Sequence, residues 1–146
     1  MNLEKLREQI SIDEGIEYNI YLDHLGYPTF GIGHLIIDSD PEKGQEVGTS
    51  VSEERVNQAF DDDVQTVVAD CKICFNSWDG YPEEAKQVFA NMMFNMGRTR
   101  LSKFKMLIAA AESGDWKEAG AQGRDSRWYK QVTNRAERLC SRLENI

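Results

Sequence analysis

The fold is decided by one stretch of the chain, Glu14-Gly-Ile-Glu-Tyr-Asn-Ile-Tyr-Leu-Asp-His-Leu-Gly-Tyr-Pro-Thr-Phe-Gly-Ile-Gly-His34. Before it, apolar residues at helical spacing predict a helix over residues 2–13, and Gly15 is a natural stop for that helix. Within it, partial alternation of apolar and polar residues predicts a small sheet over residues 16–37, with a turn at Gly26. The stretch therefore joins the end of a helix to a hairpin.

Two carboxylates and a hydroxyl stand out in this stretch, namely Glu14, Asp23 and Thr29. Glu14 lies at the expected helix end and Asp23 lies on the hairpin. A hairpin that folds back toward the helix can therefore place both carboxylates across a groove. Two carboxylates in different environments can divide the roles of acid and base between them. Cleavage of a glycosidic bond needs such a pair, but acidic residues are common and two carboxylates alone do not identify a glycoside hydrolase.

The spacing of these residues resembles the signature of the phage-type lysozymes, glycoside hydrolase family 24, which are related to the T-even phage lysozymes. That signature is Glu, eight residues, Asp or Cys, five residues, Thr, and then a Gly-Ile-Gly-His segment, which here is 31–34. Two further blocks follow in the family's order: Asn91-Met-Met-Phe-Asn-Met-Gly97, and Ser126-Arg-Trp-Tyr129 followed by Asn134-Arg-Ala136. Together the three blocks span most of the chain, which makes the resemblance specific.

The resemblance implies a fold of the α+β class, mainly helical and two-lobed, with a small antiparallel sheet and a long connecting helix. We expect residues 1–146 to form a single lysozyme domain. The small sheet lobe is expected at about 14–52 and the connecting helix at about 53–71. The helical lobe is expected at about 1–13 and 72–146.

The resemblance also implies catalytic roles. Glu14 is the expected general acid. Asp23 either activates a water as a base or stabilises positive charge on the sugar, and Thr29 helps to hold the attacking water. Partial burial and the C-terminal end of a helix would both disfavour the charged form of Glu14. Arg135 resembles the family arginine that pairs with the acid, and it would favour the charged form.

Other positions match the family outside the catalytic residues. His34 and Asp63 match an ion pair that ties the small sheet to the long helix, so we expect His34 to be structural. Leu107 falls where relatives often carry a polar residue. The substrate-binding residues that the resemblance implies are Leu35, Phe94, Gln122 and Arg135.

The net charge of −8 is unevenly distributed along the chain. Residues 1–96 carry a net charge of −13, whereas residues 97–146 carry +5. The basic part suits an anionic polymer such as the bacterial cell wall, although a solvated helical surface would also explain it. The acidic total argues against a nucleic-acid-binding protein.

The sequence has no apolar run long enough to span a membrane, and its first residues lack the pattern of a secretory signal. We therefore expect synthesis in the host cytoplasm and no stable insertion into a membrane. The resemblance implies that such a protein reaches the cell wall with the help of a membrane-permeabilising partner. We expect a monomer whose partner is its peptidoglycan substrate.

The three cysteines, Cys71, Cys74 and Cys140, are expected to be free thiols. The Cys71-x-x-Cys74 spacing is also found in zinc sites. However, it lies in a run with helical periodicity, no second cysteine pair follows, and the only histidines are His24 and His34. No metal or cofactor is implied.

The remainder of the chain predicts a series of helices after a loop over residues 38–50. Ser50 and Glu53 have the spacing of a capping box at the start of a helix of about 20 residues. Pro82 suits the first turn of a helix that Gly97 ends, and its apolar stripe is expected in the core. A helix is predicted over Met106–Glu112. Asp115 is predicted to cap the next helix, and Thr133 to cap the last one.

The predicted function is a muramidase that hydrolyses the β-1,4 bond between N-acetylmuramic acid and N-acetylglucosamine with inversion at the anomeric carbon. The first alternative is a lytic transglycosylase, which forms an anhydro-sugar without water. Such enzymes typically work with one acid, so Asp23 and Thr29 argue against this alternative. The second alternative is a wall-binding module without activity, and the presence of Glu14 argues against it.

Overall fold

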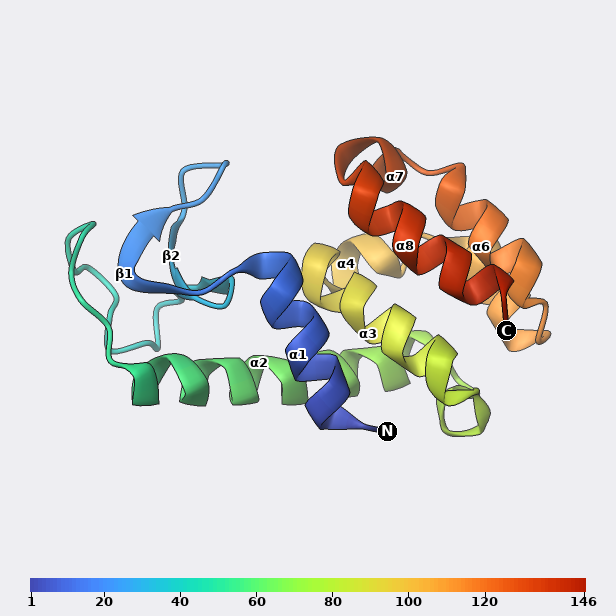
Figure 1. Cartoon of the computed structure of the whole chain (residues 1–146), viewed down its shortest axis with the longest axis horizontal. Coiled ribbons are helices and arrows are strands. Elements are labelled where there is room, and N and C mark those ends of the chain that lie inside the picture. The colour runs from blue at the N-terminus through green and yellow to red at the C-terminus, as the bar shows by residue number, and fades with distance from the viewer. The chain divides into compact units, whose positions relative to one another are not determined.

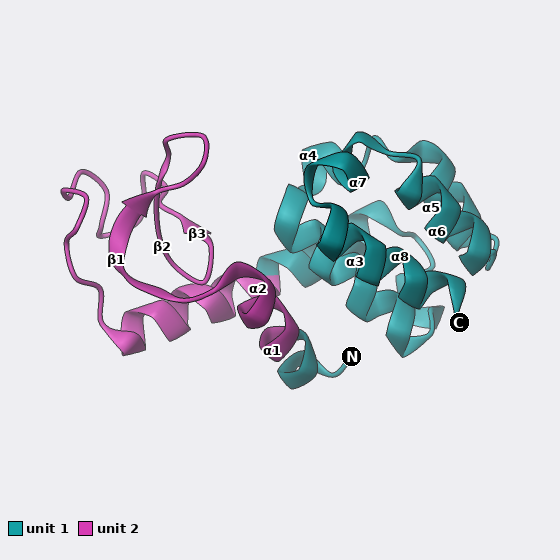
Figure 2. Ribbon diagram, turned by 45° about the horizontal axis from the view of Figure 1, so that its top comes forward, with its two compact units in different colours: residues 1–6, 66–146 teal, residues 7–65 magenta.

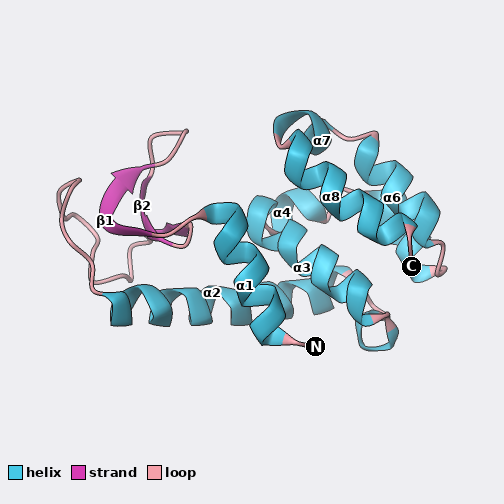
Figure 3. Ribbon diagram, in the orientation of Figure 1, coloured by secondary structure: helices cyan, strands magenta, loops and turns pink.

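In the computed structural model, which describes all residues 1–146, the chain is mainly helical and carries one small antiparallel sheet (Figure 1, Figure 3). The elements are α1 (Leu3–Glu14), β1 (Glu17–Leu22), β2 (Pro28–Gly31), β3 (His34–Leu35), α2 (Glu53–Cys74), a 3-10 turn η1 (Trp78–Gly80), α3 (Glu83–Met96), α4 (Arg98–Leu101), α5 (Lys105–Glu112), α6 (Trp116–Arg124), α7 (Arg127–Gln131) and α8 (Thr133–Glu144). The predicted α+β, mainly helical class is confirmed. No helix is both long enough and apolar enough to cross a lipid bilayer.

The chain forms two compact units, one of residues 7–65 and the other of residues 1–6 and 66–146 (Figure 2). Below, they are called the sheet unit and the helical unit. Helices α1 and α2 each contribute residues to both units. The lobe boundaries and the separate connecting helix that we expected from the sequence stay predictions.

In the sheet unit the strands lie in the order β1-β2-β3, each antiparallel to its neighbour. Tyr21 pairs with Thr29, and Thr29 pairs with Leu35, so these three side chains share one face of the sheet. Phe30 points to the opposite face because successive side chains of a strand alternate, and it is completely buried. The Arg55 guanidinium of α2 lies 5.5 Å from the centre of the Phe30 ring, so this opposite face packs on α2.

The segment after β3 contains no helix, as predicted for residues 38–50, and its end pairs with β1 through an isolated bridge between Asn19 and Ser50. Ser50 is therefore not the cap of α2, and the predicted capping box is wrong. The hydroxyl of Ser52 accepts a hydrogen bond of 3.1 Å from the backbone N–H of Arg55 instead. Capping thus comes from the second of two serines that precede the helix.

In the helical unit, the apolar stripe of α3 is buried as predicted, and Phe89 stacks on Phe75 with ring centres 4.4 Å apart. The predicted cap at Asp115 is confirmed because its side chain accepts from the backbone N–H of Glu118. The predicted cap at Thr133 is wrong, since α8 already includes Thr133 and its hydroxyl donates to the Tyr129 carbonyl. The short helices α4 and α7 were not predicted.

Candidate active site

A tight turn between β1 and β2 fixes the position of Asp23. Its Oδ1 accepts hydrogen bonds of 2.8 Å from the backbone N–H groups of Leu25 and Tyr27. The backbone N–H of Asp23 in turn donates to the Tyr27 carbonyl at 2.9 Å, and the N–H of Gly26 donates to the Asp23 carbonyl. Asp and Gly are favoured in such turns because the short carboxylate bonds nearby amides and Gly tolerates positive φ, here +86°. The carboxylate of Asp23 is therefore oriented entirely by its own hairpin.

The same hairpin fixes Thr29, whose hydroxyl donates a hydrogen bond of 2.9 Å to the Tyr27 carbonyl. The backbone N–H of Tyr27 thus donates to the Asp23 side chain and its carbonyl accepts from Thr29, so both side chains are held by the backbone of one residue. Since the hydroxyl hydrogen of Thr29 is engaged, its oxygen is left as an acceptor. The Oδ2 atom of Asp23 is likewise an acceptor, since both of that side chain's hydrogen bonds go to Oδ1. Two acceptors from one turn can share the two hydrogens of a single water.

Glu14 is the last residue of α1, is half-buried, and lies against the turn between β2 and β3. A Cβ atom added to Gly33 in that turn would stand 2.9 Å from Glu14 Oε1 and 3.3 Å from its Cδ. Gly33 also has a φ of +62°, a region that L side chains rarely adopt. The absence of a side chain at Gly33 therefore makes room for the Glu14 carboxylate, a role that we did not anticipate from the sequence.

Tyr21 is a member of this site that sequence reasoning missed. Partial burial raises the pKa of the Tyr21 hydroxyl, and the negative charges of Glu14, Glu17 and Asp23 raise it further. The hydroxyl therefore stays protonated while lying in the field of both candidate catalytic carboxylates. A signal was present in the sequence, because Tyr21 and Asp23 are two residues apart at the end of a strand and such residues point to the same face.

The predicted ion pair between His34 and Asp63 is present, with Nδ1 and Oδ2 2.7 Å apart. A second carboxylate, Asp40, lies 2.8 Å from the Nε2 atom of His34 and was not anticipated. Arg55 bonds Asp40 and also holds Glu42 through two hydrogen bonds of 2.9 Å. This network ties β3 and the following loop to α2, so His34 lies in a structural cluster within the sheet unit.

Burial lowers the pKa of His34, but the hydrogen bonds to Asp63 and Asp40 outweigh it, and the net pKa is raised. The opposite balance holds for Asp40, whose burial raises its pKa while the Ile37 amide, His34 and Arg55 together lower it. The charged forms of both partners are therefore favoured in the folded protein.

The structure places the expected site residues in two groups. Glu14, Asp23, Thr29 and Leu35 belong to the sheet unit, where Leu35 is about half exposed beside the buried Thr29. The other three belong to the helical unit, namely Phe94, Gln122 and Arg135. The expected pairing of Arg135 with Glu14 stays a prediction.

Within the helical unit, the two sequence blocks that resemble the family are bonded to each other. Arg135 of α8 donates from Nε to the Asn91 side chain of α3 at 2.8 Å, and both residues are buried. One turn further along α3, Asn95 accepts a hydrogen bond of 2.7 Å from the indole N–H of Trp128. Asn91 and Asn95 of α3 therefore each bond a buried donor of the other block, and the bond from Asn91 helps to hold the Arg135 side chain in place.

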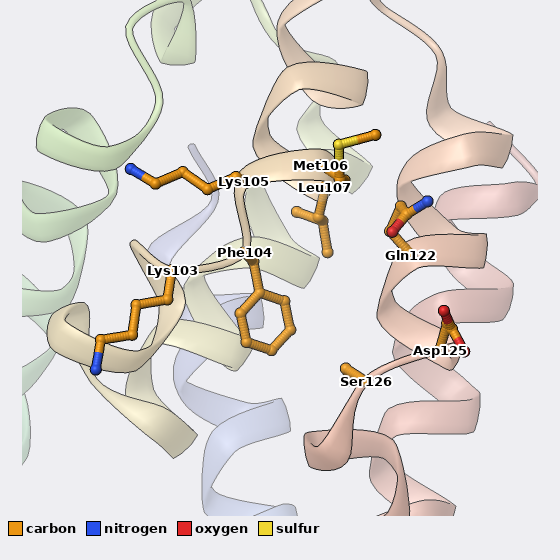
Figure 4. Close-up of a pocket in the computed structure, with 8 residues that line it drawn as sticks. All are labelled: Lys103, Phe104, Lys105, Met106, Leu107, Gln122, Asp125 and Ser126. Carbon is orange, nitrogen blue, oxygen red and sulfur yellow. The ribbon is translucent and has the colours of Figure 1, made fainter.

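Gln122 lines a hollow of about 280 Å³ together with Phe104 and Leu107 (Figure 4). Its side-chain N–H₂ donates to Glu118 on the same helix, which leaves its carbonyl oxygen as an acceptor. Leu107 is almost completely buried and contributes an apolar wall rather than a polar contact. Phe94, on α3, is half-buried.

The three cysteines lie on α2 and α8. Cys71 and Cys140 are buried, Cys74 is half-buried, and all three are free thiols, as expected. No group of three or more His, Cys, Asp or Glu side chains has the arrangement of a metal centre. Burial raises the pKa of the Cys71 thiol strongly and that of Cys140 to about 11, so both remain protonated near neutral pH.

Comparison with known proteins decides the family. Residues 11–145 match the model of a family described as phage lysozyme. The chain belongs to the phage lysozyme family. Two similar proteins, probable T4-type lysozymes 2 and 1 of Dictyostelium discoideum, are 27% and 26% identical, and each alignment covers 95% of this chain and 93% of the relative.

A third similar protein is the pre-baseplate central spike protein Gp5 of Enterobacteria phage T4. It is 31% identical over 152 residues, which cover 92% of this chain and 26% of that protein. The chain thus spans about a quarter of the length of this relative, whereas it spans nearly all of the two Dictyostelium proteins.

Proposed function

We infer that this chain is a muramidase that hydrolyses the β-1,4 bond between N-acetylmuramic acid and N-acetylglucosamine in peptidoglycan. The observation that carries this proposal is the arrangement of Asp23 and Thr29, whose acceptor atoms are fixed by the Tyr27 peptide groups. Membership of the phage lysozyme family supports the same substrate. A module that only binds the wall would not need a carboxylate and a hydroxyl positioned so that both can accept hydrogen bonds from one water.

In the proposed reaction, Glu14 donates its proton to the glycosidic oxygen as the bond to the anomeric carbon breaks. A water held by Asp23 Oδ2 and Thr29 Oγ1 attacks that carbon from the opposite face, and Asp23 takes the proton that the water releases. One proton thus leaves Glu14 and one arrives at Asp23 for each bond cleaved. The protonated Tyr21 contributes no charge of its own to this site.

The positions of the two carboxylates along β2 support inversion of the anomeric carbon. Asp23 is bonded to the turn that precedes β2, and Glu14 lies against the turn that follows it. At about 3.3 Å per residue, the four residues of β2 extend over roughly 10 Å. Such a span suits the carboxylate separation of about 6.5–9.5 Å in inverting enzymes better than the shorter separation of about 5–5.5 Å in retaining ones.

The test is digestion of purified peptidoglycan followed by mass spectrometry and by proton NMR of the first product. Hydrolysis gives reducing ends that carry an added water, and inversion gives the α-anomer before mutarotation. A product that is lighter by one water would identify a lytic transglycosylase. A first β-anomer, or a sugar trapped covalently on Asp23, would make Asp23 a nucleophile. If no soluble product is released, the chain is better explained as a wall-binding module.

A further inference from the structure

A second hollow in the helical unit is lined by none of the expected site residues. It has a volume of about 540 Å³ and lies where the end of α2, the short helix α4 and the start of α5 meet. Three cationic side chains line it, Arg98, Lys103 and Lys105. This hollow is called the basic hollow below.

The cations of the basic hollow are largely free of carboxylates. Arg98 forms one ion pair, with Asp70 at 3.4 Å, and half of its side chain remains exposed. Lys103 and Lys105 are exposed and form no salt bridge. In Figure 4 both ammonium groups extend to the same side of the chain, away from the ring of Phe104. The positive charges of Lys103 and Lys105 are therefore left without a carboxylate partner in the protein.

Hydroxyl and apolar groups complete the lining. Thr99 and Ser102 also line the hollow, and the Ser102 hydroxyl donates to the Thr99 carbonyl at 3.0 Å, which leaves its oxygen only as an acceptor. Ile73, which is 61% exposed, and Ile108 provide apolar surface at the same place. Ammonium and guanidinium groups recognise oxyanions, and the isoleucines suit aliphatic carbon next to them. The chemistry therefore fits carboxylates carried on short aliphatic chains.

The basic hollow adjoins the hollow that contains Gln122. Lys103 and Lys105 line both, so the segment between them forms a ridge with Phe104 and Gln122 on one side and the cations on the other. Gln122 is one of the expected substrate-binding residues, so under the proposed function a sugar would lie in its hollow. A substituent that leaves the sugar over this ridge would arrive at the ammonium groups.

We propose that the basic hollow binds the carboxylates of the peptide stem of peptidoglycan while the glycan to which the stem is attached lies in the hollow of Gln122. This inference rests on the proposed function and names a further part of the same substrate. Peptide stems carry free carboxylates on aliphatic chains at the lactyl side of the sugar, which is the chemistry that the lining selects. The net charge of +5 on residues 97–146 favours such a ligand further.

The test uses NMR titration of the isotope-labelled full chain with the tripeptide L-alanyl-γ-D-glutamyl-meso-diaminopimelate. The same tripeptide with all carboxylates amidated is the ligand control. The variant K103Q/K105Q removes both ammonium groups, and K117Q/K130Q removes two exposed lysines elsewhere in the helical unit, so the two variants have the same net charge.

We expect the tripeptide to shift the backbone signals of residues 98–105, and K103Q/K105Q to weaken its binding at least tenfold. K117Q/K130Q should bind like the wild type, and the amidated tripeptide should not bind. Equal binding by K103Q/K105Q, equal binding of the amidated tripeptide, or shifts confined to other residues would overturn the proposal.

Because the tripeptide contains no glycosidic bond, its binding is independent of catalysis. A chain that binds the tripeptide in the basic hollow but leaves peptidoglycan intact would refute the muramidase proposal and retain the carboxylate site. With an active chain, K103Q/K105Q should also raise KM for peptidoglycan by a larger factor than KM for peptide-free glycan strands, because both lysines also line the hollow of Gln122. An equal change of KM for both substrates would contradict the stem site.

Discussion

Replacing Gly33 with Ala tests whether the turn between β2 and β3 positions Glu14. The added Cβ would stand 2.9 Å from Glu14 Oε1, whereas ordinary contact begins at 3.4 Å, so the carboxylate must move by about 0.5 Å. Because the obstructed atom is the end of a flexible side chain, Glu14 gives way rather than the backbone. The φ of +62° adds a backbone cost of about 1–2 kcal/mol for any L side chain.

Gly44→Ala is the matched control, because Gly44 has a φ of +85° and a Cβ there would meet nothing within 4 Å. Both variants should lose about 1–2 kcal/mol of unfolding free energy in urea denaturation. Only Gly33→Ala should also lose turnover, by roughly tenfold, since a misplacement of about 1 Å at a reacting group can cost roughly a hundredfold. The assay is release of reducing ends from purified peptidoglycan at saturating substrate.

Two outcomes would refute this reasoning about Gly33. If Gly33→Ala turns over as fast as Gly44→Ala, the position of the Glu14 carboxylate does not depend on the absence of a side chain at residue 33. An equal loss of turnover in both variants would show that the backbone strain, rather than the contact with Glu14, slows the reaction.

Two further predictions concern His34 and Thr29. His34→Asn should destabilise the protein most between pH 3.8, the ordinary pKa of Asp40, and pH 6.5, that of His34. Because the pKa of His34 is raised, its contribution to the free energy of unfolding disappears as pH rises through its pKa in the folded protein. Because the pKa of Asp40 is lowered, its contribution disappears as pH falls through its pKa in the folded protein. Urea denaturation at pH 5 and pH 9 checks this, and an equal loss at both would contradict it. Thr29→Val should lower turnover on the order of a hundredfold, whereas Thr29→Ser, which keeps the hydroxyl, should retain most of it; equal turnover by both variants would show that the hydroxyl holds no water.

The parts of the site that could be predicted from the sequence are those held by hydrogen bonds between residues that are close in the sequence. Asp23, Gly26 and Thr29 lie within seven residues of one another, and their bonds run through the backbone between them. A turn could therefore be expected from residue types alone. The same holds for the cap at Asp115, which bonds an amide three residues away.

What could not be predicted depends on contacts between distant residues or on choices between equivalent ones. Gly33 meets Glu14 across nineteen residues of sequence, and nothing local distinguishes its role from that of Gly31. Asp40 joins His34 only because the loop after β3 turns back. Ser50 and Ser52 both suit a cap, and the pairing of Ser50 with β1 decides between them.

Short elements were missed for a different reason. Helices α4 and α7 contain four and five residues, which is about one turn each, so their apolar residues cannot repeat at helical spacing. A capping signal was present for α7, since the Ser126 hydroxyl accepts from the backbone N–H of Tyr129. Such a signal without periodicity does not separate a helix from a turn.

Glu14 is the proposed general acid of a muramidase, and the rate of peptidoglycan hydrolysis by Glu14→Gln tests this role. The amide keeps the size of the side chain beside Gly33 but carries no transferable proton. The variant should therefore fold normally by circular dichroism and lose activity by roughly a hundred- to ten-thousand-fold. A folded Glu14→Gln that releases reducing ends at nearly the wild-type rate would contradict the account.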